Sequence, residues 1–348
     1  MNRINANKAP GMKALGVAVL AVTVLAALPV FAQEKKLVFR VAHQFSPNDK
    51  RYDLAPWMEQ VTRATHGEVQ FEVYPSEQLG KAKDMMSLVQ SGVADFALFV
   101  PSYVSEKMPL TAVLELPGMS ANACQAMNIY AKLAREGGFL AQREYGPQGV
   151  RVLIPGSTAP YRLMSSKKSI ETLKDIEGMK VRVLAGAMEL TMQRLKAVGI
   201  KMPGPELHQA LSRGTLDGVI FSYGAIVSPS YLLPARFVTT DSFGSAIIAL
   251  ITSEKRWRAI PDPVKKVMLE AAEVSSQRIC KAIDEEDDDA LDKLKRNGVT
   301  VVKWSDADKK EMEAKIASVT ADWAAETDKR GKPGTEAVKA ALAARDTR

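Results

Sequence analysis

The feature that most limits what this chain can fold into is a joint that occurs twice. Residues 88–95 read Leu-Val-Gln-Ser-Gly-Val-Ala-Asp, and residues 210–217 read Ala-Leu-Ser-Arg-Gly-Thr-Leu-Asp. Each joint is an apolar helix end, a glycine suited to a left-handed cap, two residues and an aspartate that enters a strand. The repetition predicts two halves of similar design.

The order of strands and helices around the two joints supports this prediction. Hydrophobic periodicity predicts strands over 37–42, 69–73 and 96–100, with helices over 51–66 and 81–91 between them. Strands over 179–183, 200–202 and 219–221 alternate in the same way with helices over 188–198 and 205–213. Two such β-α-β-α-β units predict an α/β protein of two lobes, each with a mostly parallel sheet. Ligands bind beyond the carboxyl ends of such strands, so two facing lobes would form a cleft.

The C-terminal third becomes helical. After a strand over 246–252, the apolar spacing predicts a helix over 263–297, long enough to cross both lobes. An edge strand over 299–302 and a helix over 306–327 follow, and the tail is expected to fray. We expect lobe I over 33–159 plus about 247–287, lobe II over 160–246 plus about 288–335, and a frayed end over 336–348.

The first 32 residues have the composition of an export signal. Arg3, Lys8 and Lys13 precede an uncharged run over 14–32 that ends in Val-Phe-Ala. A membrane anchor is the alternative, because the run approaches the length of a membrane span. Pro29 and the cleavage-like end favour a removable signal peptide over residues 1–32.

Charge and cysteine content exclude several classes of protein. The predicted signal peptide carries three basic residues and no acid, so its removal lowers the formal net charge from +7 to +4. No basic run is interleaved with aromatic residues. Nucleic acid is therefore not an expected partner. Cys124 and Cys280 could pair after export or remain two buried thiols.

Signatures of enzymes and metal sites are missing from the sequence. It contains no Gly-x-Gly-x-x-Gly, Gly-x-Ser-x-Gly or phosphate-binding loop. His66 fits a helix end, His208 is expected to face solvent, and His43 follows the first strand, as either a cleft residue or a structural one. The acidic run over 284–289 is expected to be a solvated helix face. We therefore expect no enzyme, no metal and no cofactor.

Two arginines are the better candidates for a binding site. Arg182 lies in a short apolar strand, where an unpaired buried guanidinium would be very costly, so it must contact an anion or reach water. Arg162 lies in an apparent neighbouring strand, and two such arginines could clamp a carboxylate. The alternative is an ion pair within the protein, with Asp175, Glu177 or Glu189.

Five segments in order along the chain together resemble the periplasmic substrate-binding proteins of TRAP (tripartite ATP-independent periplasmic) transporters, the DctP-like family. They are Tyr-Pro-Ser-Glu-Gln-Leu-Gly at 74–80, Gly-Val-Ala-Asp-Phe at 92–96, Leu-Pro at 116–117, Asp-Ile-Glu-Gly-Met-Lys-Val-Arg-Val at 175–183 and Glu-Leu-His-Gln-Ala-Leu-Ser-Arg-Gly-Thr-Leu-Asp-Gly at 206–218. The resemblance runs from about residue 37 to residue 304. It implies a two-lobed periplasmic-binding-protein fold, with the long helix spanning both lobes.

The resemblance also implies a function in the periplasm. Family members bind organic carboxylates between the lobes and deliver them to the small and large membrane subunits of a permease driven by a sodium gradient. The family's characteristic carboxylate-binding arginine corresponds to Arg182, and a second, less universal one corresponds to Arg162. A binding protein for an ATP-driven importer, a sensor subunit and a periplasmic enzyme on the same architecture are the alternatives.

The departures from the family pattern concern the ligand. Many members carry Gln-Glu-Asn after the second Asp-Gly, whereas this chain continues with Val-Ile-Phe221 and then Ser-Tyr223. An apolar and aromatic cleft suits a monocarboxylate with an apolar or aromatic body better than a sugar acid. The ligand contacts expected from the first lobe are His43, Gln78, Ser102 and Tyr103.

Overall fold

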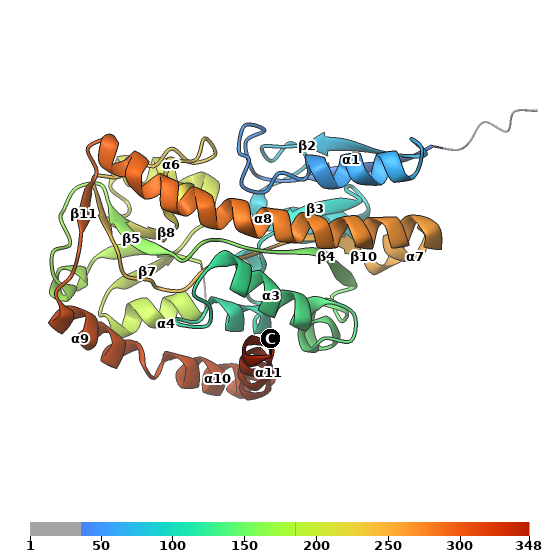
Figure 1. Cartoon of the computed structure of the whole chain (residues 1–348). Helices are drawn as coiled ribbons and strands as arrows, with labels where there is room; N and C mark the ends of the chain where they lie inside the picture. The colour runs from blue at the N-terminus through green and yellow to red at the C-terminus, as the bar shows by residue number, and fades with distance from the viewer. Residues whose placement is uncertain (1–35, 185, 348) are drawn as a thin grey trace, which may run out of the picture. The chain divides into compact units, whose positions relative to one another are not determined.

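The computed structural model describes residues 36–184 and 186–347, and in this part of the chain two mixed sheets are flanked by helices (Figure 1). The predicted signal peptide over 1–32 lies outside the described residues. Of the helices that are described, none has the length and apolar character needed to cross a membrane.

The first sheet forms the centre of what we call lobe I. Its five strands lie in the order β2 (Val69–Tyr74), β1 (Leu37–Ala42), β3 (Phe96–Phe99), β10 (Ile247–Ser253) and β4 (Val150–Ser157). β1 pairs in parallel with β2 and β3, while β10 is antiparallel to both β3 and β4. The connecting helices are α1 (Ala55–Ala64) and α2 (Met85–Ser91), close to the predicted ranges.

The second sheet forms the centre of lobe II. Its six strands lie in the order β11 (Thr300–Val302), β9 (Phe237–Thr239), β5 (Arg162–Ser165), β8 (Gly218–Phe221), β6 (Lys180–Val183) and β7 (Val198–Lys201). β6 is parallel to β7 and β8, whereas β5 is antiparallel to β8 and β9. The connecting helices are α4 (Ala187–Arg194) and α5 (Leu207–Arg213).

The repeated joint has the same structure in both lobes. Gly92 caps α2 at a φ of 78°, and Gly214 caps α5 at a φ of 75°, a conformation in which a residue with a Cβ is strained. The aspartate that follows accepts a backbone N–H from the neighbouring strand in each case. Asp95 accepts from Arg40 at 2.7 Å, and Asp217 accepts from Lys180 at 2.8 Å. The predicted repeat is therefore confirmed down to its hydrogen bonds.

The long helix α8 (Asp262–Arg296) agrees with the prediction to within one residue at each end. It runs past both sheets in Figure 1 and packs against α1 and β4 of lobe I and α6 (Tyr223–Val227) and β11 of lobe II.

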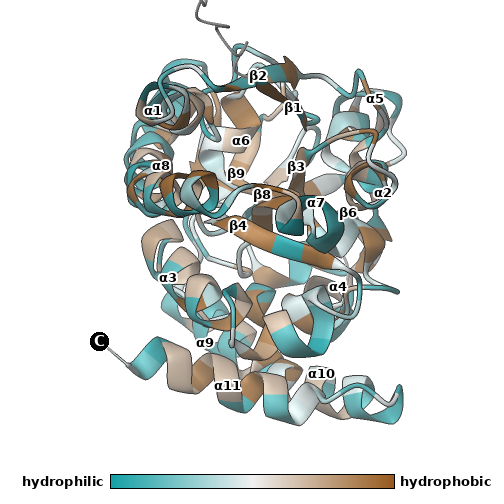
Figure 2. Cartoon of the chain, turned by 90° about the vertical axis from the view of Figure 1, so that its right-hand side faces the viewer, coloured by the Kyte–Doolittle hydropathy of each residue, from teal (hydrophilic) through white to brown (hydrophobic). Residues whose placement is uncertain are grey.

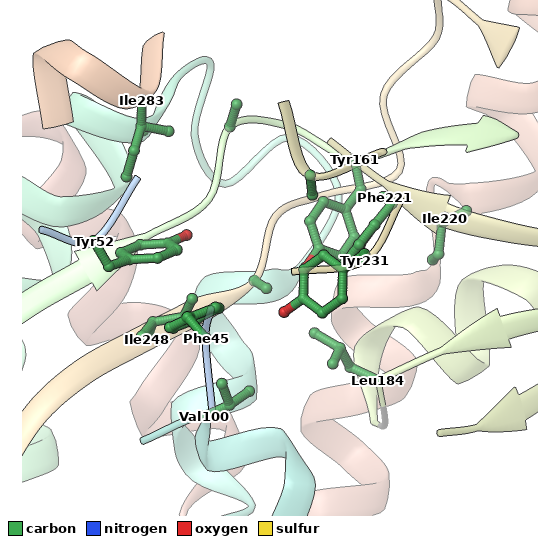
Figure 3. Close-up of a cluster of buried hydrophobic side chains, with 14 of the residues drawn as sticks. Phe45, Tyr52, Val100, Tyr161, Leu184, Ile220, Phe221, Tyr231, Ile248 and Ile283 are labelled. Atoms are coloured by element: carbon green, nitrogen blue, oxygen red, sulfur yellow. The ribbon is translucent and has the colours of Figure 1, made fainter. Parts of the chain in front are cut away.

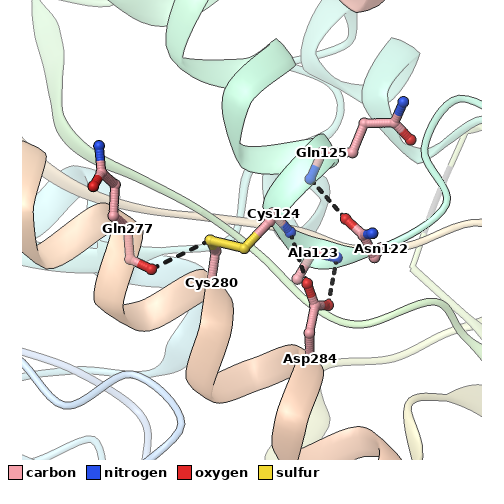
Figure 4. The surroundings of a disulfide bond; sticks show 7 residues. All are labelled: Asn122, Ala123, Cys124, Gln125, Gln277, Cys280 and Asp284. Carbon is pink, nitrogen blue, oxygen red and sulfur yellow. Dashed lines mark hydrogen bonds between the residues drawn. A yellow bond between two sulfur atoms is a disulfide. The ribbon is translucent and has the colours of Figure 1, made fainter.

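A disulfide joins Cys124 to Cys280 and ties α3 (Ala123–Ala134) to α8 (Figure 4). One turn further along α8, the carboxylate of Asp284 accepts the N–H groups of Ala123 and Cys124 at 2.7 and 3.2 Å. The acidic run is therefore only partly the solvated face that we expected. Asp284 satisfies the first turn of α3, whose N–H groups have no partner within their own helix.

The C-terminal residues differ from the expectation. Two helices, α9 (Asp306–Ile316) and α10 (Val319–Lys329), replace the single one predicted, and α11 (Gly334–Asp346) occupies the segment expected to fray. α11 buries Ala337 and Ala341 and packs against α3 and α10, so its alanines supply a small apolar face for packing. The lobe boundaries stay a prediction.

The remaining helical turns lie between these elements. They are α7 (Glu254–Arg258), the 3₁₀ turns Ala82–Asp84, Pro101–Val104, Leu110–Glu115, Leu173–Ile176 and Gly204–Glu206, and the π turn Ala141–Tyr145. Hydrophobic side chains fill two large clusters. Figure 2 shows β4 as mostly hydrophobic between helices whose outer turns are hydrophilic.

Candidate ligand-binding site

Arg182 is wholly buried in β6 and only partly satisfied. Its Nε donates to the carbonyl of Met202 at 2.9 Å. The other two nitrogens, Nη1 and Nη2, are buried and have no hydrogen-bond partner within residues 36–184 and 186–347. Two unpaired donors on a buried cation are costly, so this arrangement is suited to an anion with two acceptor oxygens.

The acids of the alternative explanation are paired with lysines instead. Asp175, Glu177 and Glu189 form ion pairs with Lys168, Lys196 and Lys201 at 2.9, 3.1 and 3.0 Å, respectively. Within the described part of the chain, no ion pair reaches Arg182. Among residues 36–184 and 186–347, the guanidinium of Arg182 is therefore buried without a carboxylate in direct contact.

One aromatic ring lies against this guanidinium, and further rings pack around that ring. The central carbon of the guanidinium lies 5.1 Å from the centroid of the Phe221 ring. Tyr161 and Tyr231 pack on Phe221 with centroids 5.3 and 5.1 Å away. Figure 3 shows the ring of Tyr52 from lobe I opposite that of Tyr231 from lobe II, with Phe45 stacked 5.0 Å from Tyr52. All five rings are buried.

A buried carboxyl group lies in the same region. Glu115, at the end of the 3₁₀ turn Leu110–Glu115, is fully buried, and its Oε1 accepts from Ser102 Oγ at 2.6 Å and from the Ile247 N–H at 3.4 Å. Burial raises the pKa of Glu115 to about 7, while the hydrogen bonds and the charge of Arg182 act in the opposite direction.

Polar contacts join the two lobes beside the aromatic rings. Asp49 of lobe I accepts from the hydroxyls of Ser228 and Ser230 of lobe II, both at 2.6 Å. Arg51 binds Asp49 through Nε and Nη2 and also donates to Ser228 Oγ at 3.0 Å. Burial disfavours the Asp49 charge, but the bonds from Arg51 and the two serines outweigh it and lower the pKa of Asp49 to about 2. The Ser46 N–H completes the set by donating to Ser230 Oγ at 3.0 Å. We call Asp49, Arg51, Ser228 and Ser230 the interlobe latch.

The second predicted arginine has a partner within the protein. Arg162 lies 3.5 Å from Asp287 of α8, donates to the carbonyl of Pro160, and stacks over the Tyr223 ring at 5.0 Å. The hydroxyl of Tyr223 donates to the carbonyl of Thr239 at 2.6 Å. Arg162 and Tyr223 thus lie together, and their contact with a ligand stays a prediction.

The candidates from lobe I fall into different environments. Ser102 is buried on Glu115, and the hydroxyl of Tyr103 accepts from the Gly204 N–H at 3.0 Å across the lobes. His43 keeps a buried Nδ1 without a partner in the described residues, and burial lowers its pKa. The side chain of Gln78 is exposed to solvent. Of the four ligand contacts predicted in lobe I, only Gln78 lies at the surface, and ligand contact by all four stays a prediction.

Several residues of this region were missed by the sequence. Phe45 and Tyr231 lie in loops with no regular pattern, Tyr52 lies in a turn within the range predicted as the helix over 51–66, and the latch joins two loops that are distant in the chain. Glu115 had one available signal, because it is a single acid inside the apolar run 110–117.

Comparison with known proteins supports a common origin for most of the chain. The family model of bacterial extracellular solute-binding proteins, family 7, matches residues 41–327. The C4-dicarboxylate-binding periplasmic protein of Rhodobacter capsulatus is 25% identical over 294 residues, which are 83% of this chain and 86% of that protein.

Solved structures show the same fold. A TRAP solute-binding protein from Rhodoferax ferrireducens T118, in complex with copurified benzoate, matches with a TM-score of 0.80 at 22% identity, over 89% of this chain and 98% of the other. A marine metagenome TRAP solute-binding protein specific for aromatic acid ligands, in complex with metahydroxyphenylacetate, matches with a TM-score of 0.78 at 25% identity, over the same 89% and 98%.

Proposed function

Since this chain belongs to the bacterial extracellular solute-binding proteins of family 7, we propose that it captures an organic monocarboxylate with an aromatic or apolar body for a TRAP transporter. One observation carries the proposal. The terminal nitrogens of Arg182 are buried beside the ring of Phe221 and have no hydrogen-bond partner among the residues that the structure describes.

The geometry supports a division of labour in the site. Arg182 binds the two carboxylate oxygens in the bidentate arrangement that a guanidinium favours. Phe221, Tyr161 and Tyr231 then contact the body of the ligand from lobe II, while Phe45 and Tyr52 contact it from lobe I. Aromatic side chains offer large apolar faces but few hydrogen-bonding groups, which suits a benzoate-like acid better than a polyhydroxylated one.

Domain closure follows from the burial of the site. A ligand reaches Arg182 only when the lobes separate, and the latch together with the Tyr103–Gly204 hydrogen bond holds them closed afterwards. The ligand shifts this equilibrium by its higher affinity for the closed state. Arg162, which contacts Asp287 of α8, assists Arg182 in binding the carboxylate from lobe II.

The cellular role follows the family. Its members are periplasmic binding proteins, and the predicted signal peptide over 1–32 would export this chain. The bound acid would pass to the small and large membrane subunits of the transporter unchanged, without catalysis, metal or cofactor.

A binding panel tests the proposal. Calorimetry would compare benzoate and 3-hydroxyphenylacetate with succinate and galacturonate. We expect the two aromatic acids to bind at least tenfold more tightly than the other two. Tighter binding of succinate or galacturonate would contradict the aromatic assignment and leave a binding protein for another acid.

A further inference from the structure

Glu115 is a buried carboxyl group that no neighbouring cation neutralises directly. Its Oε2 is buried and without a hydrogen-bond partner, and no ion pair reaches it from any residue that the structure describes. Oε1 is held by the Ser102 hydroxyl and the Ile247 N–H. Both donors can also bond to a neutral carboxyl, so these two hydrogen bonds are compatible with either protonation state of Glu115.

The charges and titratable groups around Glu115 come from several elements. Arg182 of β6 is the cation that favours its charged form. The other titratable groups that interact with it are the phenols of Tyr130, Tyr145 and Tyr161, from α3, the π turn Ala141–Tyr145 and the link between β4 and β5. These phenols are neutral near pH 7, because burial raises the pKa of each of them further above its ordinary value. After burial, the hydrogen bonds from Ser102 and Ile247 act most strongly on the pKa of Glu115, and Arg182 is the one cation among the described residues that acts on it. Neutralising Arg182 is therefore how a bound acid can change the charge of Glu115.

A bound carboxylate removes that support. Once the ligand neutralises Arg182, Glu115 loses its favourable cation and gains a second negative charge nearby. Two carboxylates that share one buried site do not both stay ionised at low cost.

We propose that this protein takes up its organic anion together with a proton, and that Glu115 holds that proton beside Arg182. The inference rests on the proposed function in one respect, which is that a carboxylate occupies Arg182. It does not depend on whether the body of the ligand is aromatic.

The sign of the pH dependence follows from linkage. The bound state has the higher pKa for Glu115, so it holds more protons, and affinity is greatest below the pKa of the free protein, about 7, and falls as pH rises above it. A single linked proton limits the change to about tenfold per pH unit. We expect a loss of about fivefold between pH 6.5 and pH 8.5.

Calorimetry in two buffers of different ionisation enthalpy, Tris and PIPES at pH 7.5, measures the protons taken up with benzoate, or with succinate or galacturonate if one of those binds instead. We expect a substantial fraction of one proton per ligand in the natural protein and none in Glu115→Gln, whose affinity becomes independent of pH. No uptake in the natural protein, or the same uptake in Glu115→Gln, would overturn the proposal.

Glu144 provides a matched control. Burial raises its pKa to about 7 as well, but its carboxyl is bonded to Leu110 and Thr111, and Lys332, not Arg182, is the cation acting on it. Glu144→Gln should keep the proton uptake of the natural protein; losing it there would contradict the assignment to Glu115.

A ligand-free measurement separates this inference from the proposed function. Carbon-13 NMR of the glutamate carboxyl groups, assigned with Glu115→Gln, would follow the titration of Glu115 without any acid present. We expect Arg182→Gln to raise the pKa of Glu115. An unchanged pKa would contradict the coupling between Arg182 and Glu115, whatever ligand binds. Failure of every acid to bind would instead count against both the proposed function and proton-linked uptake.

Discussion

Arg182 illustrates how a single residue carries a function. Its place in a short apolar strand was readable from the sequence, and with it the need for an anion or for water. The lack of an ion-pair partner for Arg182 could not be predicted, since three acids lie close enough in the sequence to pair with it. Only the structure shows that lysines pair with those acids and that, within the described part of the chain, two guanidinium nitrogens of Arg182 are buried without a partner.

Removing the Arg182 side chain should abolish most of the binding energy for an acid. A desolvated charge pair that loses one partner costs about 3–5 kcal/mol, so Arg182→Ala should weaken binding by a factor of several hundred or more. Arg182→Lys should also be damaging, because an ammonium group cannot bind two oxygens in the planar fork. Calorimetry measures both.

Arg194 serves as the control for that pair of variants. It lies on α4 of the same lobe, exposed at the surface and paired with Asp322. Arg194→Ala should bind with unchanged affinity, because exposed ion pairs contribute little. Near-natural affinity in Arg182→Ala would refute the role of Arg182.

The regular elements were accessible to sequence reasoning, whereas the loops between them were not. Strand alternation and helix caps located β1 exactly and α8 to within a residue. The latch escaped prediction because Asp49 and Ser228 belong to irregular loops of different lobes, and no local pattern reports a contact between them. The break between α9 and α10 was likewise hidden, since no glycine or proline marks it in the sequence.

Mutation of the interlobe latch tests whether the loops that carry Asp49 and Ser228 control closure. In Ser228→Ala/Ser230→Ala, the buried carboxylate of Asp49 loses two donors from the opposite lobe but keeps Arg51 from its own. The closed state is therefore weakened more than the open state, and we expect affinity to fall about tenfold or more. Stopped-flow measurements should place most of the change in the dissociation rate.

A control variant on the same loops is needed to interpret the double serine variant. Ser46 contributes only its backbone N–H to Ser230, so Ser46→Ala should leave affinity within about twofold. A double serine variant that melts earlier but binds normally would show that these bonds stabilise the fold and not closure.

At the scale of the whole molecule, the disulfide should act on stability and not on binding. Cys124 and Cys280 are separated by 156 residues, and closing so long a loop restricts the unfolded chain. Cys124→Ala/Cys280→Ala should lose about 2–4 kcal/mol and melt several degrees lower, as calorimetric melting would show. Ligand affinity should stay the same, because neither α3 nor α8 supplies one of the five rings of the aromatic site; a large loss of affinity would contradict that separation.

The burial of Arg182 implies a change in the shape of the whole molecule when a ligand binds. A residue with no exposed surface cannot receive a ligand unless the lobes part, so the free protein must populate a more open state. Small-angle scattering should therefore show a smaller radius of gyration with saturating benzoate than without it. Ser228→Ala/Ser230→Ala should shift the free protein further toward the open form, and it should need more ligand to reach the compact one. Identical scattering with and without a ligand that calorimetry shows to be bound would contradict closure and require another route to Arg182.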